Sequence, residues 1–125
     1  MSKLYFDGSS NILTNAVTSG YILETSLIEV KNTKTHEGYT TNNEAEYLAL
    51  IEGLKKAIDL GVSDLEILGD SQLVVYQMLG RYKVKANNLK PLHKEAKQLL
   101  TLIPKFTFTW LARKGNKADA VSRHE

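Results

Sequence analysis

The sequence contains no cysteine, only two prolines and a single tryptophan among its 125 residues. Without cysteine, the chain can form neither a disulfide framework nor a thiolate metal site. No apolar run approaches the length that crosses a membrane, and the N-terminal MSKLYFDGSS lacks the apolar region of a signal peptide. These absences predict a cytoplasmic protein with no membrane association.

Charge is distributed unevenly along the chain. The net charge of +2 conceals 5 Lys+Arg against 11 Asp+Glu in residues 1–80, and 11 Lys+Arg against 3 Asp+Glu in residues 81–125. An acidic half joined to a basic half suits a protein that binds metal cations at one place and a polyanion at another. The alternative interpretation is that the two sets of charges mix on the folded surface.

The composition is that of an ordinary globular domain, with 42% hydrophobic and 24% charged residues. The chain is long enough for one core and too short for two. It shows no internal repeat, low-complexity tract or long linker. We therefore expect a single domain over residues 1–125, and we expect it to be a monomer.

The first forty residues predict three strands in succession. Residues 3–7 form a short apolar strand before a Gly-Ser-Ser turn, and residues 20–30 alternate or run apolar. A third strand is expected over about 33–40, after a hairpin loop at the sequence NTK. Three strands in sequence indicate an antiparallel meander.

An amphipathic helix is expected over about 43–60. Asn42 or Asn43 would serve as its N-cap, and Gly61 is well placed just past its end.

The second half of the chain alternates strands and helices. Pro91 can open a helix at its first turn and Pro104 ends it. The further elements are a strand at 65–69, a helix at 71–79, the helix between the prolines, a strand at 106–112 with Trp110 in the core, and a helical turn or two in NKADAVSR. The order βββαβααβα predicts an α/β fold: a five-stranded mixed sheet, with an antiparallel three-strand meander plus parallel strands, and flanking helices.

The segment between the second and third expected helices is basic and contains no acid. Such a stretch can follow a row of phosphates with a salt-sensitive affinity. The alternative interpretation is a solvated connector. This basic connector, residues 81–90, carries Arg81, Lys83, Lys85 and Lys90, with Tyr82 interleaved.

Four carboxylates occupy unexpected places. Asp7 interrupts or ends the first apolar strand, Asp70 follows another, and Asp119 has alanines on both sides. Each could be an ordinary turn, N-cap or surface residue. Glu46 differs because it heads the apolar stripe of the helix, where a carboxylate needs a cation or hydrogen-bond donors. Glu44 falls on the polar face by the same count, and we expect it to be solvated.

A shared site would explain all four carboxylates. Ligands of open α/β sheets bind where strand ends and helix starts converge. Neighbouring carboxylates repel one another and need a counter-charge. Oxygen ligands without cysteine favour Mg²⁺ or Mn²⁺. Four carboxylates can balance two divalent ions, which stand about 3.5–4 Å apart in two-metal phosphoryl-transfer sites.

Four motifs resemble those of ribonuclease H of type I: DGSS after the first strand, TTNNEAEY at a helix start, LGDSQLV at a strand–helix junction and NKADAVS near the C-terminus. The expected element order matches that fold over nearly the whole chain. The resemblance implies a metal-dependent endonuclease that hydrolyses the RNA strand of RNA–DNA hybrids. It also implies a two-metal mechanism that leaves 3′-hydroxyl and 5′-phosphate ends.

The resemblance assigns roles to individual residues. Thr41 would contact a DNA phosphate, and Gln72 would reach the minor groove together with both asparagines of TTNN. The backbone of Gly8 and the side chain of Glu46 would sense a ribose 2′-hydroxyl. The implied catalytic metal ligands are Asp7, Glu46, Asp70 and Asp119. The candidate substrate-binding residues are Gly8, Ser9, Thr41, Asn42, Asn43, Ser71, Gln72, Arg81, Lys83, Lys85 and Arg113.

The sequence departs from the family pattern in two ways. Many members carry a histidine in a glycine-rich loop before the last acidic residue, whereas the loop here is ARKGNK, residues 112–117. Arg113 or Lys114 would compensate. Several bacterial members also insert an extra basic helix after the DSQ helix, which is missing here. The chain therefore resembles a compact form of the family.

Other functions remain open at this point. The fold could bind a hybrid without cutting it, although all four acidic residues are present. A 3′–5′ exonuclease also uses four acidic residues, although TTNN and DSQ favour the endonuclease. The chain could also be the ribonuclease H domain of a reverse transcriptase. Met1 and the complete set of elements favour a free-standing protein.

Overall fold

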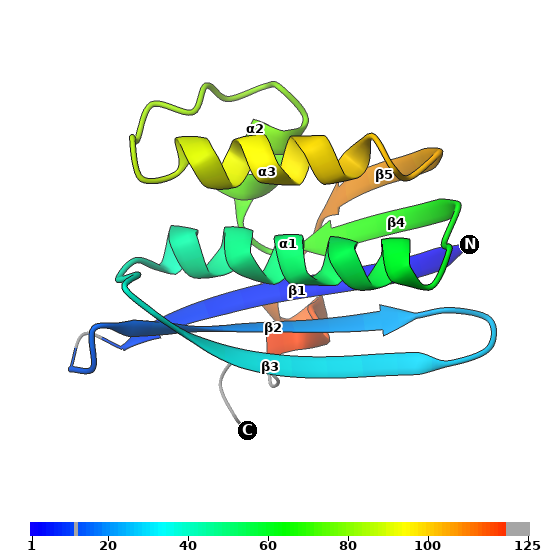
Figure 1. The fold of residues 1–125 in the computed structure, drawn as a ribbon, viewed down its shortest axis with the longest axis horizontal. Coiled ribbons are helices and arrows are strands. Elements are labelled where there is room, and N and C mark those ends of the chain that lie inside the picture. The colour runs from blue at the N-terminus through cyan, green and yellow to red at the C-terminus, as the bar shows by residue number, and fades with distance from the viewer. Residues whose placement is uncertain (12, 120–125) are drawn as a thin grey trace.

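A five-stranded sheet forms the frame of the molecule, with its strands in the order β3-β2-β1-β4-β5 (Figure 1). β2 pairs antiparallel with both β1 and β3, whereas β4 runs parallel to both β1 and β5. The computed structural model describes residues 1–11 and 13–119. Its elements are β1 (Ser2–Asn11), β2 (Ala16–Glu24), β3 (Glu29–Glu37), α1 (Asn42–Asp59), β4 (Asp64–Gly69), α2 (Gln72–Met78), α3 (Lys90–Leu100), β5 (Lys105–Trp110) and the 3₁₀ turn η1 (Arg113–Gly115).

This architecture confirms the α/β class, the mixed five-stranded sheet and the predicted order of elements as far as β5. The last helix, expected in NKADAVSR, begins at residue 118, and the rest of that segment lies outside the described residues. Among the described residues, no helix is both long enough and apolar enough to cross a membrane.

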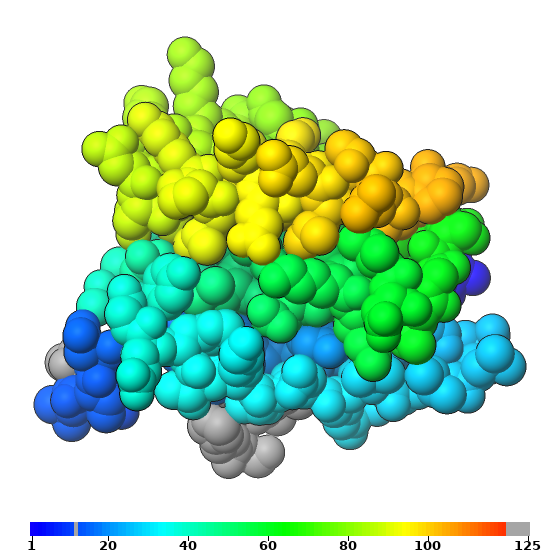
Figure 2. Space-filling view, viewed as in Figure 1, coloured from blue at the N-terminus to red at the C-terminus, as the bar shows by residue number. Residues whose placement is uncertain are grey.

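All three helices contribute to one large core on the same face of the sheet. Figure 2 shows α3, α1 and β3 side by side on the surface of this face. The opposite face carries a smaller apolar cluster of Tyr5, Ile22, Leu68 and Ala118. The chain that follows β5 passes behind the sheet in Figure 1 and supplies Ala118 to that cluster.

The turn between β2 and β3 lies at residues 25–28 and not at the expected sequence NTK. Thr25 closes this turn, because its backbone N–H donates to the carbonyl of Ile28 at 2.8 Å. Its Oγ1 also accepts from the backbone N–H groups of Leu27 at 3.2 Å and Ile28 at 3.0 Å. NTK lies inside β3, an edge strand of mostly polar residues. Polar edge strands lack the apolar pattern that marks a buried strand.

The first helix begins one residue earlier than expected, with Thr41 as its N-cap. Thr41 Oγ1 accepts from the Glu44 N–H at 3.1 Å, and Glu44 Oε1 accepts from the Thr41 N–H at 3.0 Å. This reciprocal capping box satisfies two backbone donors at once, which neither Asn42 nor Asn43 would do. At the other end, Gly61 follows the helix with a φ of 72°, as predicted.

α1 approaches β1 so closely that Gly8 has no room for a side chain. A Cβ atom at Gly8 would lie 2.3 Å from the carbonyl carbon of Ala45 and 2.4 Å from the backbone nitrogen of Glu46. Farther along the helix, a Cβ atom on Gly53 would lie 2.6 Å from the side chain of Leu4. One glycine on each element therefore sets the separation of helix and strand.

Gly8→Ala should lower the free energy of unfolding by about 3 kcal/mol, the upper end of the range for overpacked cores. The reason is that the added methyl group meets helix backbone, which cannot rotate away. Gly115→Ala is the control, because its methyl group would meet only a side-chain atom of Leu111 at 3.2 Å. Urea denaturation of both variants measures the difference, and equal losses would contradict the close contact at Gly8.

Candidate active site between the middle of β1 and the end of β4

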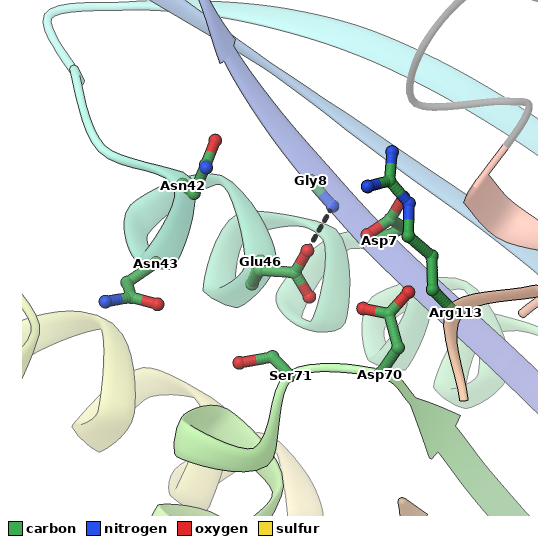
Figure 3. Close-up of a pocket in the computed structure, with 8 residues that line it drawn as sticks. All are labelled: Asp7, Gly8, Asn42, Asn43, Glu46, Asp70, Ser71 and Arg113. Carbon is green, nitrogen blue, oxygen red and sulfur yellow. Dashed lines mark hydrogen bonds between the residues drawn. The ribbon is translucent and has the colours of Figure 1, made fainter. Parts of the chain in front are cut away.

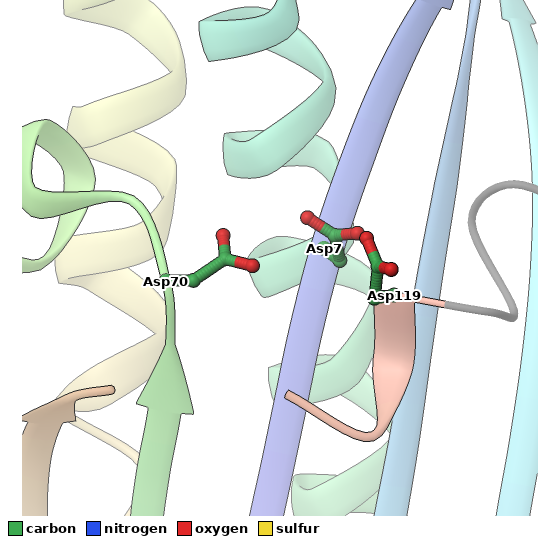
Figure 4. Close-up of side chains that lie close together, drawn as sticks. All are labelled: Asp7, Asp70 and Asp119. Atoms are coloured by element: carbon green, nitrogen blue, oxygen red, sulfur yellow. The ribbon is translucent and has the colours of Figure 1, made fainter. Parts of the chain in front are cut away.

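Three aspartates converge on the middle of the sheet (Figure 4). Phe6 of β1 is the register partner of Gly69, the last residue of β4, so Asp7 and Asp70 follow side by side. Asp119 reaches them from the segment after η1. One carboxylate oxygen from each aspartate lies within 4.8 Å of the other two. The fold thus brings together residues that are up to 112 positions apart in sequence.

Glu46 adds a fourth carboxylate from the first turns of α1 (Figure 3). Its side chain is only 6% exposed, in agreement with its place at the head of the apolar stripe. Oε1 accepts a hydrogen bond of 2.8 Å from the backbone N–H of Gly8. Oε2 is buried and has no hydrogen-bond donor among the described residues. A carboxylate oxygen in that position needs a proton or a cation.

Burial and neighbouring charge disfavour the charged form of two carboxylates of the cluster, Glu46 and Asp70. Burial raises the pKa of Glu46 well above its ordinary value, and a carboxyl–carboxyl contact with Asp7 raises it further. A hydrogen bond between two carboxyl groups requires a proton on one of them. Burial, followed by the charge of Asp7, also raises the pKa of Asp70. The side-chain amide of Asn116 partly opposes that second shift.

The cavity beside the cluster has a volume of about 190 Å³. Arg113 is the only basic residue among the described residues that line it. Its Nε donates to Asp119 Oδ1 at 3.1 Å. One guanidinium cannot balance four carboxylates, and every ligand atom offered is a hard oxygen. The arrangement therefore fits a divalent cation such as Mg²⁺ or Mn²⁺.

Five of the predicted substrate-binding residues line this cavity. Asn42 Oδ1 accepts from the backbone N–H of Ser10 at 2.9 Å and from its hydroxyl at 2.8 Å, so the amide bridges α1 to β1. Ser71 caps α2, with Oγ accepting from the N–H of Val74 at 3.2 Å. The five residues are Gly8, Asn42, Asn43, Ser71 and Arg113.

The other predicted substrate-binding residues lie outside the cavity lining. The hydroxyl of Thr41, expected to meet a phosphate, is engaged in the capping box at the start of α1. Lys83 lines a second, wider cavity of about 590 Å³ between α2, the basic connector and α3. The residues outside the first cavity are Ser9, Thr41, Gln72, Arg81, Lys83 and Lys85.

The expectation that Glu44 is solvated is wrong, because its side chain is only 8% exposed. Glu44 lies in the first turn of α1. There the residues just before the helix cover the side of the helix that the sequence analysis had assigned to solvent. Burial alone would raise the pKa of this carboxyl. Donors from Thr40, Thr41 and Asn88 outweigh burial and lower the pKa below its ordinary value.

Two residues that support the site were missed or misplaced by the sequence analysis. Trp110, expected in the core, is 41% exposed at the sheet edge, and its indole N–H donates to the Asp70 carbonyl at 3.0 Å. Asn116, which was not singled out, is buried and donates to the Phe6 carbonyl at 2.9 Å. It also accepts from the Ala118 N–H at 3.1 Å, a local turn bond typical of asparagine. Both residues fix the backbone around the carboxylates.

Comparisons with known proteins identify the family of this chain. A family model described as reverse transcriptase-like matches residues 5–124. Ribonuclease HI of Halobacterium salinarum is 36% identical over a match of 123 residues. The match covers 94% of this chain and 60% of that protein. The chain belongs to the type I ribonuclease H family. The crystal structure of RNase H1 from Halobacterium salinarum has a TM-score of 0.86 and 34% identity, covering 98% of this chain and 95% of that one.

Two further ribonuclease H structures are similar. The N-terminal RNase H domain of Rv2228c from Mycobacterium tuberculosis has a TM-score of 0.87 at 34% identity, over 98% of this chain and 91% of that one. LC11-RNase H1 in complex with an RNA/DNA hybrid has a TM-score of 0.84 at 28% identity, over 99% of this chain and 95% of that one. In sequence, the bifunctional protein Rv2228c is 43% identical over 79 residues, 63% of this chain and 22% of that protein. The chain thus spans about a fifth of the mycobacterial relative.

Removing a negative charge from this ribonuclease H cluster should stabilise the fold when no divalent cation is present. Glu46→Gln should raise the free energy of unfolding at pH 7 by about 1–3 kcal/mol, the range for an unpaired buried polar group. The folded-state pKa of Glu46 is raised, so its charge destabilises the fold at neutral pH. The gain should shrink as the pH falls through that raised pKa and vanish below the ordinary value of 4.5, where both states are protonated.

Urea denaturation in EDTA at pH 7 and about pH 4 measures this gain in the range where Glu46 loses its charge. Glu37→Gln, at an exposed position of β3, is the control and should change stability by less than about 0.5 kcal/mol. A loss of stability in Glu46→Gln at pH 7 would mean that Oε2 has a donor in the folded state.

Proposed function

We propose that this chain is a metal-dependent endonuclease that hydrolyses the RNA strand of RNA–DNA hybrids. The observation that carries the proposal is the cluster of four carboxylates in a member of the type I ribonuclease H family. Two of them, Asp7 and Glu46, are buried, and Glu46 Oε2 has no hydrogen-bond partner among the described residues. The hybrid complex of the similar LC11-RNase H1 supports the substrate class. All the proposed ligands come from one chain, which supports action as a monomer.

Asp7, Glu46, Asp70 and Asp119 would hold Mg²⁺ or Mn²⁺, with two ions per site when substrate is bound. The bound ions would supply the Lewis acidity that phosphodiester hydrolysis needs and would offset the repulsion within the cluster. The proposed products carry 3′-hydroxyl and 5′-phosphate ends. Arg113, beside Asp119, is placed to hold a phosphate where other family members have a loop histidine.

The protein itself would select RNA and position it. Oε1 of Glu46 and the backbone of Gly8 lie 2.8 Å apart, so one ribose 2′-hydroxyl could contact both. A DNA nucleotide at that position would leave the Glu46 carboxylate without this donor, which would disfavour DNA. We assign the hybrid minor groove to Asn42, Asn43 and Gln72. The strand phosphates are assigned to Ser9, Thr41, Ser71, Arg81, Lys83 and Lys85.

The decisive experiment is incubation with an internally labelled RNA–DNA hybrid in Mg²⁺, in Mn²⁺ and in EDTA. Internal cuts in the RNA strand with either metal, and none in EDTA, support the endonuclease. Hybrid binding without any cut would favour a binding module. Release of single nucleotides from an end-labelled strand would favour a 3′–5′ exonuclease. Extension of the product RNA by a polymerase reports the 3′-hydroxyl.

Asp70→Asn should reduce hybrid cleavage by at least about 100-fold, because an amide loses the charge that holds a metal. Asp59→Asn is the matched control, since Asp59 is an exposed aspartate that pairs with Lys56 at 3.7 Å, away from the cluster. It should cleave within a few-fold of the parent. Initial rates at saturating Mg²⁺ give the comparison, and similar rates in the two variants would remove Asp70 from the catalytic set.

The double variant Lys83→Ala with Lys85→Ala should bind the hybrid more weakly. Its slope of log affinity against log salt concentration should be less steep by about one to two. The maximal rate should change much less, because neither side chain lines the catalytic cavity. Lys31→Ala with Lys34→Ala removes the same charge from β3 and is the control. Affinity titrations between low and moderate salt measure the slope, and an equal change in both double variants would indicate a general charge effect.

A further inference from the structure

The second cavity, between α2, the basic connector and α3, is lined by basic side chains and by no acidic one among the described residues. Lys83 belongs to the connector, whereas Lys90, His93 and Lys97 lie on α3. Steps of three and four residues place these three side chains along one face of the helix. In the part of the chain that the structure describes, none of the three lysines forms an ion pair with a carboxylate. The cavity therefore carries positive charge that the fold does not offset.

A buried amide holds two walls of this cavity in place. Gln77 is only 4% exposed, and its Oε1 accepts from the hydroxyl of Tyr47 at 2.6 Å. Its Nε2 donates to the backbone carbonyl of Lys83 at 3.3 Å. On the side of α3, Nε2 of His93 donates to the Gln77 carbonyl at 3.3 Å, because a carbonyl can only accept. The connector and α3 are thus both attached to Gln77, and the cavity is already formed in the free protein.

The positive charges extend over a greater length than one phosphate group occupies. Lys90 and Lys97 are seven residues apart, which is about 10 Å along α3 at a rise of about 1.5 Å per residue. Successive phosphates of one nucleic-acid strand are spaced by about 3.4 Å along the duplex axis. The row of charges therefore fits several successive phosphates of a strand better than a single phosphate ion.

α2 connects the second cavity to the catalytic one. Ser71, the N-cap of this helix, lines the catalytic cavity, and Gln77 lines the second cavity. The helical rise over the six positions between them separates their backbones by about 9 Å. This separation corresponds to about three nucleotide steps along the axis of a duplex. One hybrid is therefore long enough to contact both cavities at the same time.

We propose that the second cavity binds the sugar–phosphate backbone of the hybrid a few nucleotides away from the cut, with Lys90 and Lys97 of α3 as phosphate contacts beside the connector. This inference rests on the proposed function and extends its substrate site. Lysine binds phosphate as a point charge, so the cavity adds affinity and orientation but reads no base sequence. Because the cavity is formed before binding, little conformational entropy is lost when the strand enters it.

Lys97→Ala tests the cavity, and Lys94→Ala is the matched control on the same helix. Both lysines are exposed, but only Lys97 is among the described residues that line the cavity. Fluorescence anisotropy of a labelled hybrid in EDTA measures affinity without cleavage. We expect Lys97→Ala to raise Kd about 2–5-fold, and to make the slope of log affinity against log salt concentration less steep by about one. Lys94→Ala should leave the slope unchanged.

Backbone amide chemical shifts identify what the cavity binds. Gly80 and Lys83 both line it, so hybrid added in EDTA should shift their amide signals in the parent protein. The same addition should shift them much less in Lys97→Ala. Inorganic phosphate, at an equal concentration of phosphate groups, should shift them little, because it lacks the successive charges of a strand.

The outcomes separate this site from the proposed function. Equal changes of the salt slope in Lys97→Ala and Lys94→Ala would indicate a general charge effect and would overturn the site. Saturation of the Gly80 and Lys83 signals by inorganic phosphate, with no shift when hybrid is added, would overturn the nucleic-acid ligand. Both measurements are made in EDTA, so they decide the site even for a protein that cleaves nothing. Failure of the parent protein to cut hybrid in Mg²⁺ or Mn²⁺ would instead overturn the endonuclease.

Discussion

The contact between Gly8 and the first turn of α1 is the constraint on which the site depends. Because Gly8 has no side chain, the backbone of Ala45 and Glu46 can lie against β1. That approach lets the Gly8 N–H reach Glu46 Oε1 at 2.8 Å. It also places a helix carboxylate beside Asp7, the residue that precedes Gly8 in the same strand. A side chain at Gly8 would move α1 outward and carry Glu46 away from the cluster.

The short distances between the carboxylates also cause electrostatic repulsion in the folded state. Burial and mutual charge raise the pKa values of Glu46 and Asp70, so the protein alone does not favour the fully ionised cluster. The surroundings limit this repulsion without removing it: Arg113 pairs with Asp119, and Asn116 supplies an amide near Asp70. Negative charge that the protein offsets only in part attracts cations. Stability without metal and affinity for metal are therefore opposed.

The sequence predicted the parts of the fold that depend on apolar patterns and chain punctuation. The helix between Asn42 and Gly61, the order of elements and the positions of Asp7 and Asp70 after apolar runs all follow from such local signals. The prediction from sequence was wrong where side-chain hydrogen bonds between nearby residues override the apolar pattern. Thr41 and Glu44 carry the T-x-x-E signature of a capping box, which outweighs face counting in a first turn. Asn116 could not be found in this way, because its bond to Phe6 spans 110 positions.

In the structure, the charges of the two halves of the chain mix on the surface only in part. Lys117 of the basic half pairs with Glu24 at 2.7 Å, and Glu95 pairs with Lys55 at 3.4 Å, so charges from the two halves do mix on the surface. In the part of the chain that the structure describes, the basic side chains of the connector have no such ion pair. Gln77 attaches the connector through an uncharged amide, because its Nε2 donates to the backbone carbonyl of Lys83 at 3.3 Å. The fold thus attaches the connector without neutralising it, and its positive charge stays available to a polyanion at the end of α1 that carries Glu46.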